Sequence, residues 1–177
     1  MKKFILFLFV LSLFCASVNA AFVTGGVEYN EEIAQKEVFS TPLIPISENI
    51  INSHLVDSQC KLHISLQKEK KKDFFNRQVA LFSDNTYGII YKDDPLYSWY
   101  YDFNGKLISF TKKSSEEFPA KFTKYGKNGY VINTGIKISK QESYVFSPNG
   151  KLIAHWKGNL CFDGNGNVIM IRKLIED

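Results

Sequence analysis

The 177-residue sequence is poor in the residues from which most catalytic and metal sites are built. It has only three histidines and three cysteines. It contains no Cys-x-x-Cys pair, His-Glu-x-x-His helix, Gly-x-Ser-x-Gly elbow, phosphate loop or Gly-x-Gly-x-x-Gly fingerprint. These absences remove the usual signs of zinc sites, serine hydrolases and nucleotide-binding proteins. We therefore expect a protein without cofactor or metal, and not an enzyme.

Long hydrophobic runs are missing after the first twenty residues. Two lysines precede an apolar run at residues 4–16, and residues 18–20 have the composition that a signal peptidase accepts. The run is shorter than the roughly 20 residues of a membrane helix. We predict a signal peptide at residues 1–20 and export to the periplasm or the extracellular space, with no membrane span after cleavage. A retained membrane anchor is the alternative.

Excess positive charge is also modest. The chain carries a net charge of +4, and the predicted leader contributes two lysines and no acid, which leaves +2. The one dense basic cluster, "KEKKKD" at 68–73, has no interleaved aromatic residues. Such a cluster is typical of a solvated loop or a guarded sheet edge rather than of a nucleic-acid site. We expect no nucleic-acid partner.

The chain contains a repeated sequence motif. An aromatic residue stands three positions before the Asn of an Asn-Gly pair, and two aliphatic residues follow the Gly after one intervening residue. The copies are "YDFNGKLI" from Tyr101, "YGKNGYVI" from Tyr125, "FSPNGKLI" from Phe146 and "FDGNGNVI" from Phe162. A degenerate fifth copy, "FSDNTYGI" from Phe82, aligns Asn85 with the repeated Asn and Thr86 with the repeated Gly. This recurrence indicates a repeat array.

Each copy predicts a β-hairpin. Asn-Gly suits a two-residue type I′ turn, and the flanking runs are aromatic and β-branched, as in strands. We predict tight turns at Asn104-Gly105, Asn149-Gly150 and Asn165-Gly166. The implied cross-strand pairs are Tyr101 with Ile108, Trp99 with Phe110, Phe146 with Ile153, Tyr144 with His155, Phe162 with Ile169 and Leu160 with Ile171. These pairs share one face of the sheet, the aromatic face, on which His155 is expected to be partly buried and hydrogen-bonded.

The predicted fold is mainly β: a sequential antiparallel sheet of hairpins, curled or barrel-like, over residues 74–177. An N-terminal segment at residues 21–73 packs on it. Within that segment we expect helical turns at 29–38, a short helix capped by Ser47, and a strand marked by the alternation of Leu62, Ile64 and Leu66.

The second face of the sheet is also apolar. Alternation places Tyr100, Leu107, Cys161, Val168 and Met170 there, with Val131, Leu152 and Trp156 by repeat equivalence. We predict that the aromatic face is buried as the sheet curls on itself, and that residues 21–66 or a partner cover the second face. The candidate partner surface is Tyr100, Leu107, Leu152, Trp156 and Met170.

Two cysteines, Cys60 and Cys161, follow the predicted leader. In an exported protein an even number is most simply one disulfide. A Cys60–Cys161 bond would lay the N-terminal segment across the second face and close a loop of about 100 residues, worth up to roughly 4–5 kcal/mol on the chain-entropy model.

The phrase "WYYDFNGKL" at 99–107 resembles the YD repeat of the RHS family, Tyr-x-Tyr-Asp-x-x-Gly-Arg-Leu, with Trp99 in place of the first Tyr and Lys106 in place of Arg. The MORN-like repeats of small secreted bacterial proteins are similar too. The resemblance covers about residues 80–173 and implies β-hairpins. Five hairpins are too few for the toxin-enclosing shell of RHS proteins, so the resemblance does not imply that role.

Two functions are open at this point. The first is an exported, non-enzymatic module that binds a protein, glycan or envelope component. The second is a secreted effector or its immunity partner, or a small hydrolase whose site combines distant residues such as His63 or His155 with a carboxylate. "DGNGN" at 163–167 resembles part of a calcium-binding loop but is better explained as a turn. His54 and His63 are a weak metal pair.

Overall fold

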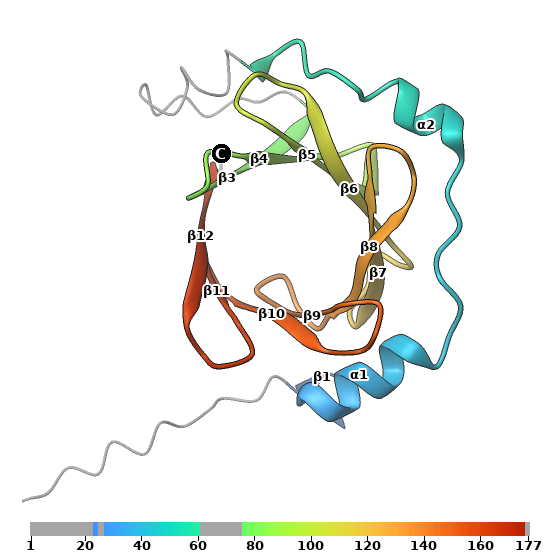
Figure 1. Cartoon of the computed structure of the whole chain (residues 1–177), viewed down its shortest axis with the longest axis vertical. Coiled ribbons are helices and arrows are strands. Elements are labelled where there is room, and N and C mark those ends of the chain that lie inside the picture. Colours follow the sequence, from blue (N-terminus) through green and yellow to red (C-terminus); the bar gives the residue numbers. More distant parts are fainter. Residues whose placement is uncertain (1–22, 25–26, 61–75, 176–177) are drawn as a thin grey trace, which may run out of the picture.

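The computed structural model describes residues 23–24, 27–60 and 76–175 (Figure 1). The N-terminal part contains two paired two-residue strands, β1 (Val23–Thr24) and β2 (Val27–Glu28), and two helices, α1 (Glu31–Phe39) and α2 (Glu48–Asn52). None of the helices in these ranges is long and apolar enough to cross a membrane. The predicted signal peptide, the strand at 62–66, the basic cluster at 68–73 and His63 lie outside the described residues.

Ten strands follow and close into one antiparallel barrel (Figure 1). Each strand pairs with the strands before and after it in the chain, and the last pairs with the first. The mainly β, sequential hairpin fold with barrel-like closure is therefore confirmed. The strands are β3 (Arg77–Phe82), β4 (Tyr87–Tyr91), β5 (Asp94–Tyr101), β6 (Leu107–Lys113), β7 (Ala120–Gly126), β8 (Val131–Lys137), β9 (Glu142–Phe146), β10 (Leu152–Lys157), β11 (Leu160–Phe162) and β12 (Val168–Ile175).

Every copy of the repeat makes one hairpin of this barrel. The repeat turns join β3 to β4, β5 to β6, β7 to β8, β9 to β10 and β11 to β12. Because successive strands are antiparallel, all five turns lie at the same end, which we call the repeat-turn end. The hairpins predicted at Asn104-Gly105, Asn149-Gly150 and Asn165-Gly166 are confirmed.

The predicted turn type is wrong. Gly105 N donates to Asp102 O at 3.0 Å, and Asp102 N donates to Lys106 O at 2.9 Å. Gly105 has a φ of 78°, whereas Asn104 is not among the residues with positive φ. This is a three-residue loop in which a type I turn is followed by a glycine bulge, rather than a two-residue type I′ turn.

The extra loop residue shifts the pair nearest each turn by one position. Tyr101 faces Leu107, Phe146 faces Leu152 and Phe162 faces Val168, in place of the isoleucines that we predicted. The pairs farther from the turns are confirmed: Trp99 with Phe110, Tyr144 with His155, and Leu160 with Ile171.

The fifth copy uses the same loop. Asn85 has a φ of 64°, its N donates to Phe82 O at 3.1 Å, and Phe82 N donates to Thr86 O at 2.9 Å. Asn85 is therefore the counterpart of the repeated glycine, and our alignment of it with the repeated asparagine was one residue off. Asparagine replaces glycine here because it tolerates left-handed backbone better than most residues.

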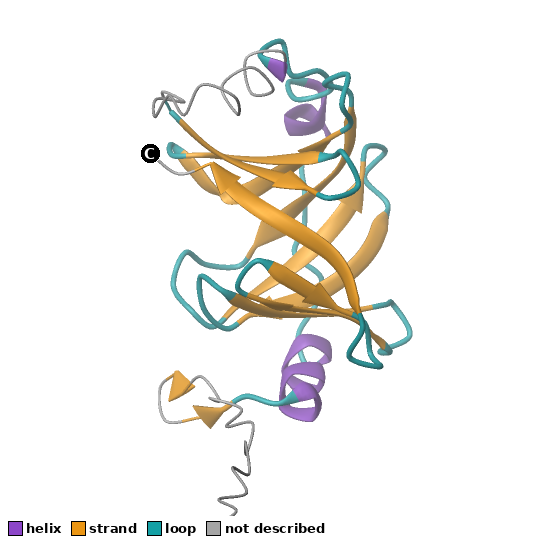
Figure 2. Ribbon diagram, turned by 90° about the vertical axis from the view of Figure 1, so that its left-hand side faces the viewer, coloured by secondary structure: helices purple, strands orange, loops and turns teal. Residues whose placement is uncertain are grey.

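The N-terminal segment, residues 29–60, lies outside the strands and is called the strap below (Figures 1 and 2). Helix α1 begins where the Asn30 side chain accepts a hydrogen bond from Ile33 N at 2.9 Å. Helix α2 starts after Ser47 as predicted, but that side chain makes no capping bond. The strap touches three consecutive repeat turns: Gln35 Nε2 donates to Gly150 O at 2.6 Å, α2 lies beside Gly129, and residues 57–60 lie beside Gly105.

The orientation of the two faces is the reverse of our prediction. The aromatic face points outward. Part of it is buried under the strap, where Ile51 belongs to one core with Trp99 and Phe110, whereas Leu160 and Ile171 on β11 and β12 are exposed. Trp99 and Phe110 stack with centroids 5.0 Å apart, and Phe110 stacks on Tyr125 at 5.3 Å. The strap therefore covers part of the aromatic face, and the second face lines the barrel interior. Alternation along a strand separates two faces but does not tell which becomes concave.

Candidate functional site: the barrel interior

The interior is lined by the residues that alternate with the buried aromatic face. Tyr100, Trp156 and Met170, three members of the predicted partner surface, point into it. Leu107 and Leu152 do not, because the loop bulges move them to the outer face, where they join the cores under the strap. The predicted five-residue surface is thus divided between the two sides of the wall.

Phe82, Tyr100 and Trp156 form an aromatic group inside. The ring of Phe82 lies 6.0 Å from that of Tyr100 and 6.1 Å from that of Trp156. These inward rings keep part of their surface open to solvent, whereas Trp99 and Phe110 on the outer face are 0% exposed. The most deeply buried rings therefore lie between wall and strap. The inner side is only partly exposed to solvent, because the inward residues Ser109, Ala120 and Cys161 are buried.

Four cations share this inner side. Lys113 lies on β6, Lys124 on β7, Lys137 on β8 and Arg172 on β12. Their inward direction follows from alternation with outward residues: Lys124 precedes Tyr125, and Lys137 follows Ile136, both of which are buried under the strap. Our sequence analysis did not single out any of the four.

Aromatic rings lie next to three of these cations, whereas Lys113 feels the charge of Glu116. The Lys124 Nζ lies 4.7 Å from the centroid of Tyr100, the Lys137 Nζ 5.8 Å from that of Phe118, and the Arg172 Cζ 5.0 Å from that of Trp156. The ion pairs found among the described residues, Arg77–Asp57 and His155–Glu142, do not involve them. The ring faces attract Lys124, Lys137 and Arg172 by cation–π interaction.

Two buried polar atoms on the inner side have no hydrogen-bond partner among the described residues: the donor Nε of Arg172 and the acceptor Oδ1 of Asn133, which faces Lys124. The formal charges on this side come from the four cations, and N–H donors with positive charge are the groups that bind an oxyanion.

The cations also act on one another. Burial, reinforced by the positive charges of Lys113, Arg172 and Lys140, lowers the pKa of Lys137 to about 8. Burial likewise lowers the pKa of Lys113 and of Lys124. The negative charge of Glu116 raises the pKa of Lys113, and that of Asp84 raises the pKa of Lys124, but by less than burial lowers them. Like charges in a partly desolvated space disfavour their own charged forms.

The predicted disulfide is absent, since both cysteines are free. Cys60 lies on the outer side, where its Sγ is 3.9 Å from Phe103 O at the β5–β6 turn. Cys161 lies on the inner side, opposite Trp156 and Met170. The barrel wall separates the two thiols. The N-terminal segment therefore lies on the aromatic face, whereas we predicted that it would lie on the second face. Burial raises the pKa of the Cys161 thiol to about 11.

His155 behaves as expected from its place in the repeat. Its Nε2 lies 2.9 Å from Glu142 Oε1, and its ring stacks on Tyr144 at 4.0 Å, on the outer face. His54 stacks on Trp99 at 3.9 Å under the strap. Within the described ranges no three His, Cys, Asp or Glu residues gather as metal ligands would.

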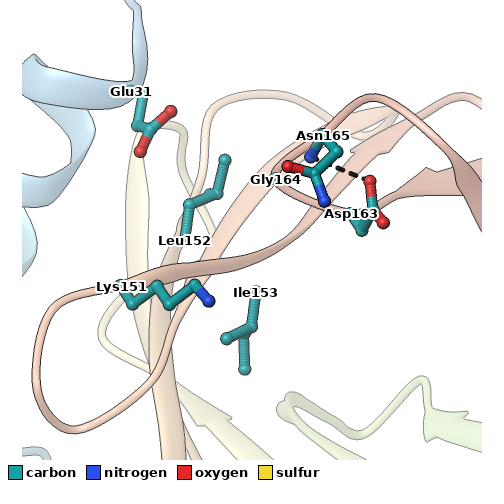
Figure 3. Close-up of a pocket in the computed structure, with 7 residues that line it drawn as sticks. All are labelled: Glu31, Lys151, Leu152, Ile153, Asp163, Gly164 and Asn165. Atoms are coloured by element: carbon teal, nitrogen blue, oxygen red, sulfur yellow. Dashed lines mark hydrogen bonds between the residues drawn. The ribbon is translucent and has the colours of Figure 1, made fainter.

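A shallow pocket of about 380 Å³ lies outside the barrel, between α1, the start of β10 and the β11–β12 turn (Figure 3). Its two acids are Glu31 and Asp163. The Asp163 Oδ1 accepts from Asn165 N at 2.9 Å and from Asn167 N at 2.8 Å. The carboxylate is therefore committed to its own turn, which supports a turn rather than a calcium loop at 163–167.

A scan against protein-family models found no match for this chain, and searches of curated proteins and of solved structures found none. The barrel interior is therefore interpreted from the chemistry of its own residues.

Proposed function

We propose that this chain is an exported, non-enzymatic binding protein that holds an anionic ligand inside a barrel of YD-like hairpins. The observation that carries the proposal is the set of four inward cations, Lys113, Lys124, Lys137 and Arg172, which have no carboxylate in ion-pair contact among the described residues.

The energetic argument starts from the cost of unpaired charge. Taking an ion out of water costs several kcal/mol, and most proteins pair such a group or neutralise it. Cation–π contacts offset only about 0.5–2 kcal/mol each. A wall that keeps four cations on one partly desolvated side is therefore best explained by a ligand that brings the missing negative charge.

The hydrolase alternative has less support. It requires a nucleophile next to a histidine and its carboxylate. In the described part of the chain, the His155 ring hydrogen-bonds to Glu142, and no hydroxyl or thiol hydrogen-bonds to that ring. The pair thus explains how His155 is held on the outer wall, and the anion-binding function is preferred.

The experiment is a titration of the purified mature protein with acetate, octanoate, phosphate and choline at constant ionic strength. Binding is followed by thermal melting and by the fluorescence of Trp156, which contacts Arg172. A ligand at 100 times its dissociation constant should stabilise the fold by about 2.7 kcal/mol. We expect at least one anion, but not choline, to raise the melting temperature.

The matched variants are Arg172→Met, inside the barrel, and Lys127→Met, on an exposed turn. Arg172→Met should abolish the anion effect, and Lys127→Met should leave it intact. Equal losses in both variants, or no response to any anion, would overturn the proposal.

A further inference from the structure

The interior cations are concentrated toward the end opposite the repeat turns. The even-numbered strands run away from those turns, and Lys113 and Lys137 are the last residues of β6 and β8. Across the intervening strand β7 they face Phe122 and Ala120 respectively, so the two lysines flank β7 near the same rim. The positive charge of Lys113 acts on Lys137.

Further donors join this pair. Arg172 extends from β12, and Lys140 lies in the β8–β9 turn; the charges of both act on Lys137. Ser143, which faces Lys137 in the β8–β9 register, adds an inward hydroxyl. The Nε of Arg172 is the buried donor without a partner. The rim therefore combines a guanidinium fork, ammonium groups and a hydroxyl.

The number of cations bears on the valence of the ligand. A monocarboxylate has two oxygens and would neutralise one of the charges. A phosphoryl dianion has three terminal oxygens and would neutralise two, and arginine and lysine are the side chains that most often hold such groups. Glu116, the acid whose charge acts on Lys113, is not in ion-pair contact with it, so the excess positive charge remains.

Resting on the proposed function, we propose that the anion bound in the barrel is a phosphoryl dianion, held by Lys113, Lys137 and Arg172 at the end opposite the repeat turns. Inorganic phosphate, a phosphate monoester and a lipid phosphate headgroup share this chemistry.

Calorimetric titration separates the ligand classes. The probes are inorganic phosphate, phenyl phosphate, short-chain phosphatidic acid, acetate and octanoate, at equal ionic strength and pH 7.5. We expect one phosphoryl probe or more to bind at least about tenfold more tightly than either carboxylate, a difference of about 1.4 kcal/mol. The tightest of the three phosphoryl probes identifies the source. Octanoate binding that depends on Arg172 and matches or exceeds phosphoryl binding would overturn this inference and leave the proposed function standing. No binding of any probe would refute both.

Proton linkage gives a second readout, which a merely structural role of Lys137 would not produce. The charged groups near Lys137 are Lys113 on β6, Lys124 on β7, Lys140 in the β8–β9 turn and Arg172 on β12, with Glu116 beside Lys113. A bound dianion favours the protonated amine and so raises the pKa of Lys137 from about 8. Binding at pH 8.5 should therefore take up protons.

The uptake is measured as a dependence of the binding enthalpy on the ionisation enthalpy of the buffer. Lys137→Met should remove it and weaken phosphoryl binding, and the folded state should tolerate this change because a poorly paired charge is removed. Lys127→Met should retain both the uptake and the affinity. Absence of proton uptake in the parent protein, or its persistence in Lys137→Met, would overturn the assignment of Lys137.

Discussion

The bulged repeat turn can be tested most cleanly at Gly166. This residue has a φ of 84°, and a Cβ added to it would meet nothing within 4 Å. Any loss of stability on substitution there reports the backbone conformation alone. Gly105 is a poorer site, because a Cβ added to it would lie 2.7 Å from Asp57 O. Gly150 is also poorer, because a Cβ added to it would lie 3.3 Å from Gln35 Nε2.

The expected magnitude follows from the cost of left-handed backbone. An L-residue pays about 1–2 kcal/mol there, and a β-branched one up to about 3 kcal/mol. Loss of glycine's extra freedom in the unfolded chain offsets about 0.4–1 kcal/mol. Gly166→Val should therefore cost about 1–2 kcal/mol. Gly166→Asn should cost less than about 1 kcal/mol, because asparagine is enriched in this conformation, and Asn85 adopts it in the fifth repeat.

The assay is equilibrium unfolding in urea, with the parent protein and both variants followed by far-ultraviolet circular dichroism. The two variants should share the parent's slope and differ in midpoint. A Val loss below about 0.5 kcal/mol, or an Asn loss equal to the Val loss, would refute the left-handed glycine bulge at this turn.

Three further predictions concern the wall and its cover. Tyr87→Phe removes the hydroxyl that donates to Asp57 Oδ2 at 2.7 Å and should cost about 1–3 kcal/mol in urea unfolding; an unchanged midpoint would contradict this anchoring role. Gly135→Ala places a Cβ 2.3 Å from a carbonyl oxygen of β9 and should cost at least about 1–3 kcal/mol, whereas wild-type stability would contradict that packing. Burial lowers the pKa of His54 and of His155, so the unfolded state binds more protons and stability should fall as pH decreases below about 6.5. Replacement of both histidines by Gln should reduce the change in melting temperature between pH 7 and pH 5. An unchanged pH dependence would contradict the role of these two histidines.

The hairpins could be predicted because their information is local. A glycine at four of the five repeat turns, Asn85 at the fifth, and β-prone flanks fix where these strands reverse. The turn type was harder, since Asn-Gly also fits the two-residue turn. A usable signal was the aspartate before it: Asp102 Oδ1 accepts from Asn104 N at 2.8 Å and from Lys106 N at 2.9 Å. This side chain stabilises the longer loop, and Asp163 does the same in the last repeat.

The inner face could not be identified from alternation alone. Both faces carry large apolar residues, and the choice depends on which one the strap covers. The prediction of an apolar second face considered its apolar members, such as Tyr100 and Trp156. Lys124 and Lys137 occupy the same alternating positions, so the positive charge of that face was present in the pattern. A curled or barrel-like sheet was predicted, but the pairing of β12 with β3 that closes it was not, and neither was the position of Arg172, whose charge acts on Lys137.

The one-hairpin repeat has a consequence for how such barrels can evolve. Duplication or deletion of a whole copy changes the strand number by two, so the closing pair stays antiparallel. Loss of a single strand would force that pair to be parallel. Because barrel diameter grows with strand number, the number of repeat copies determines the width of the barrel interior. Four copies would give about eight strands, which side chains alone can fill. A tandem duplication would widen the interior without altering any turn.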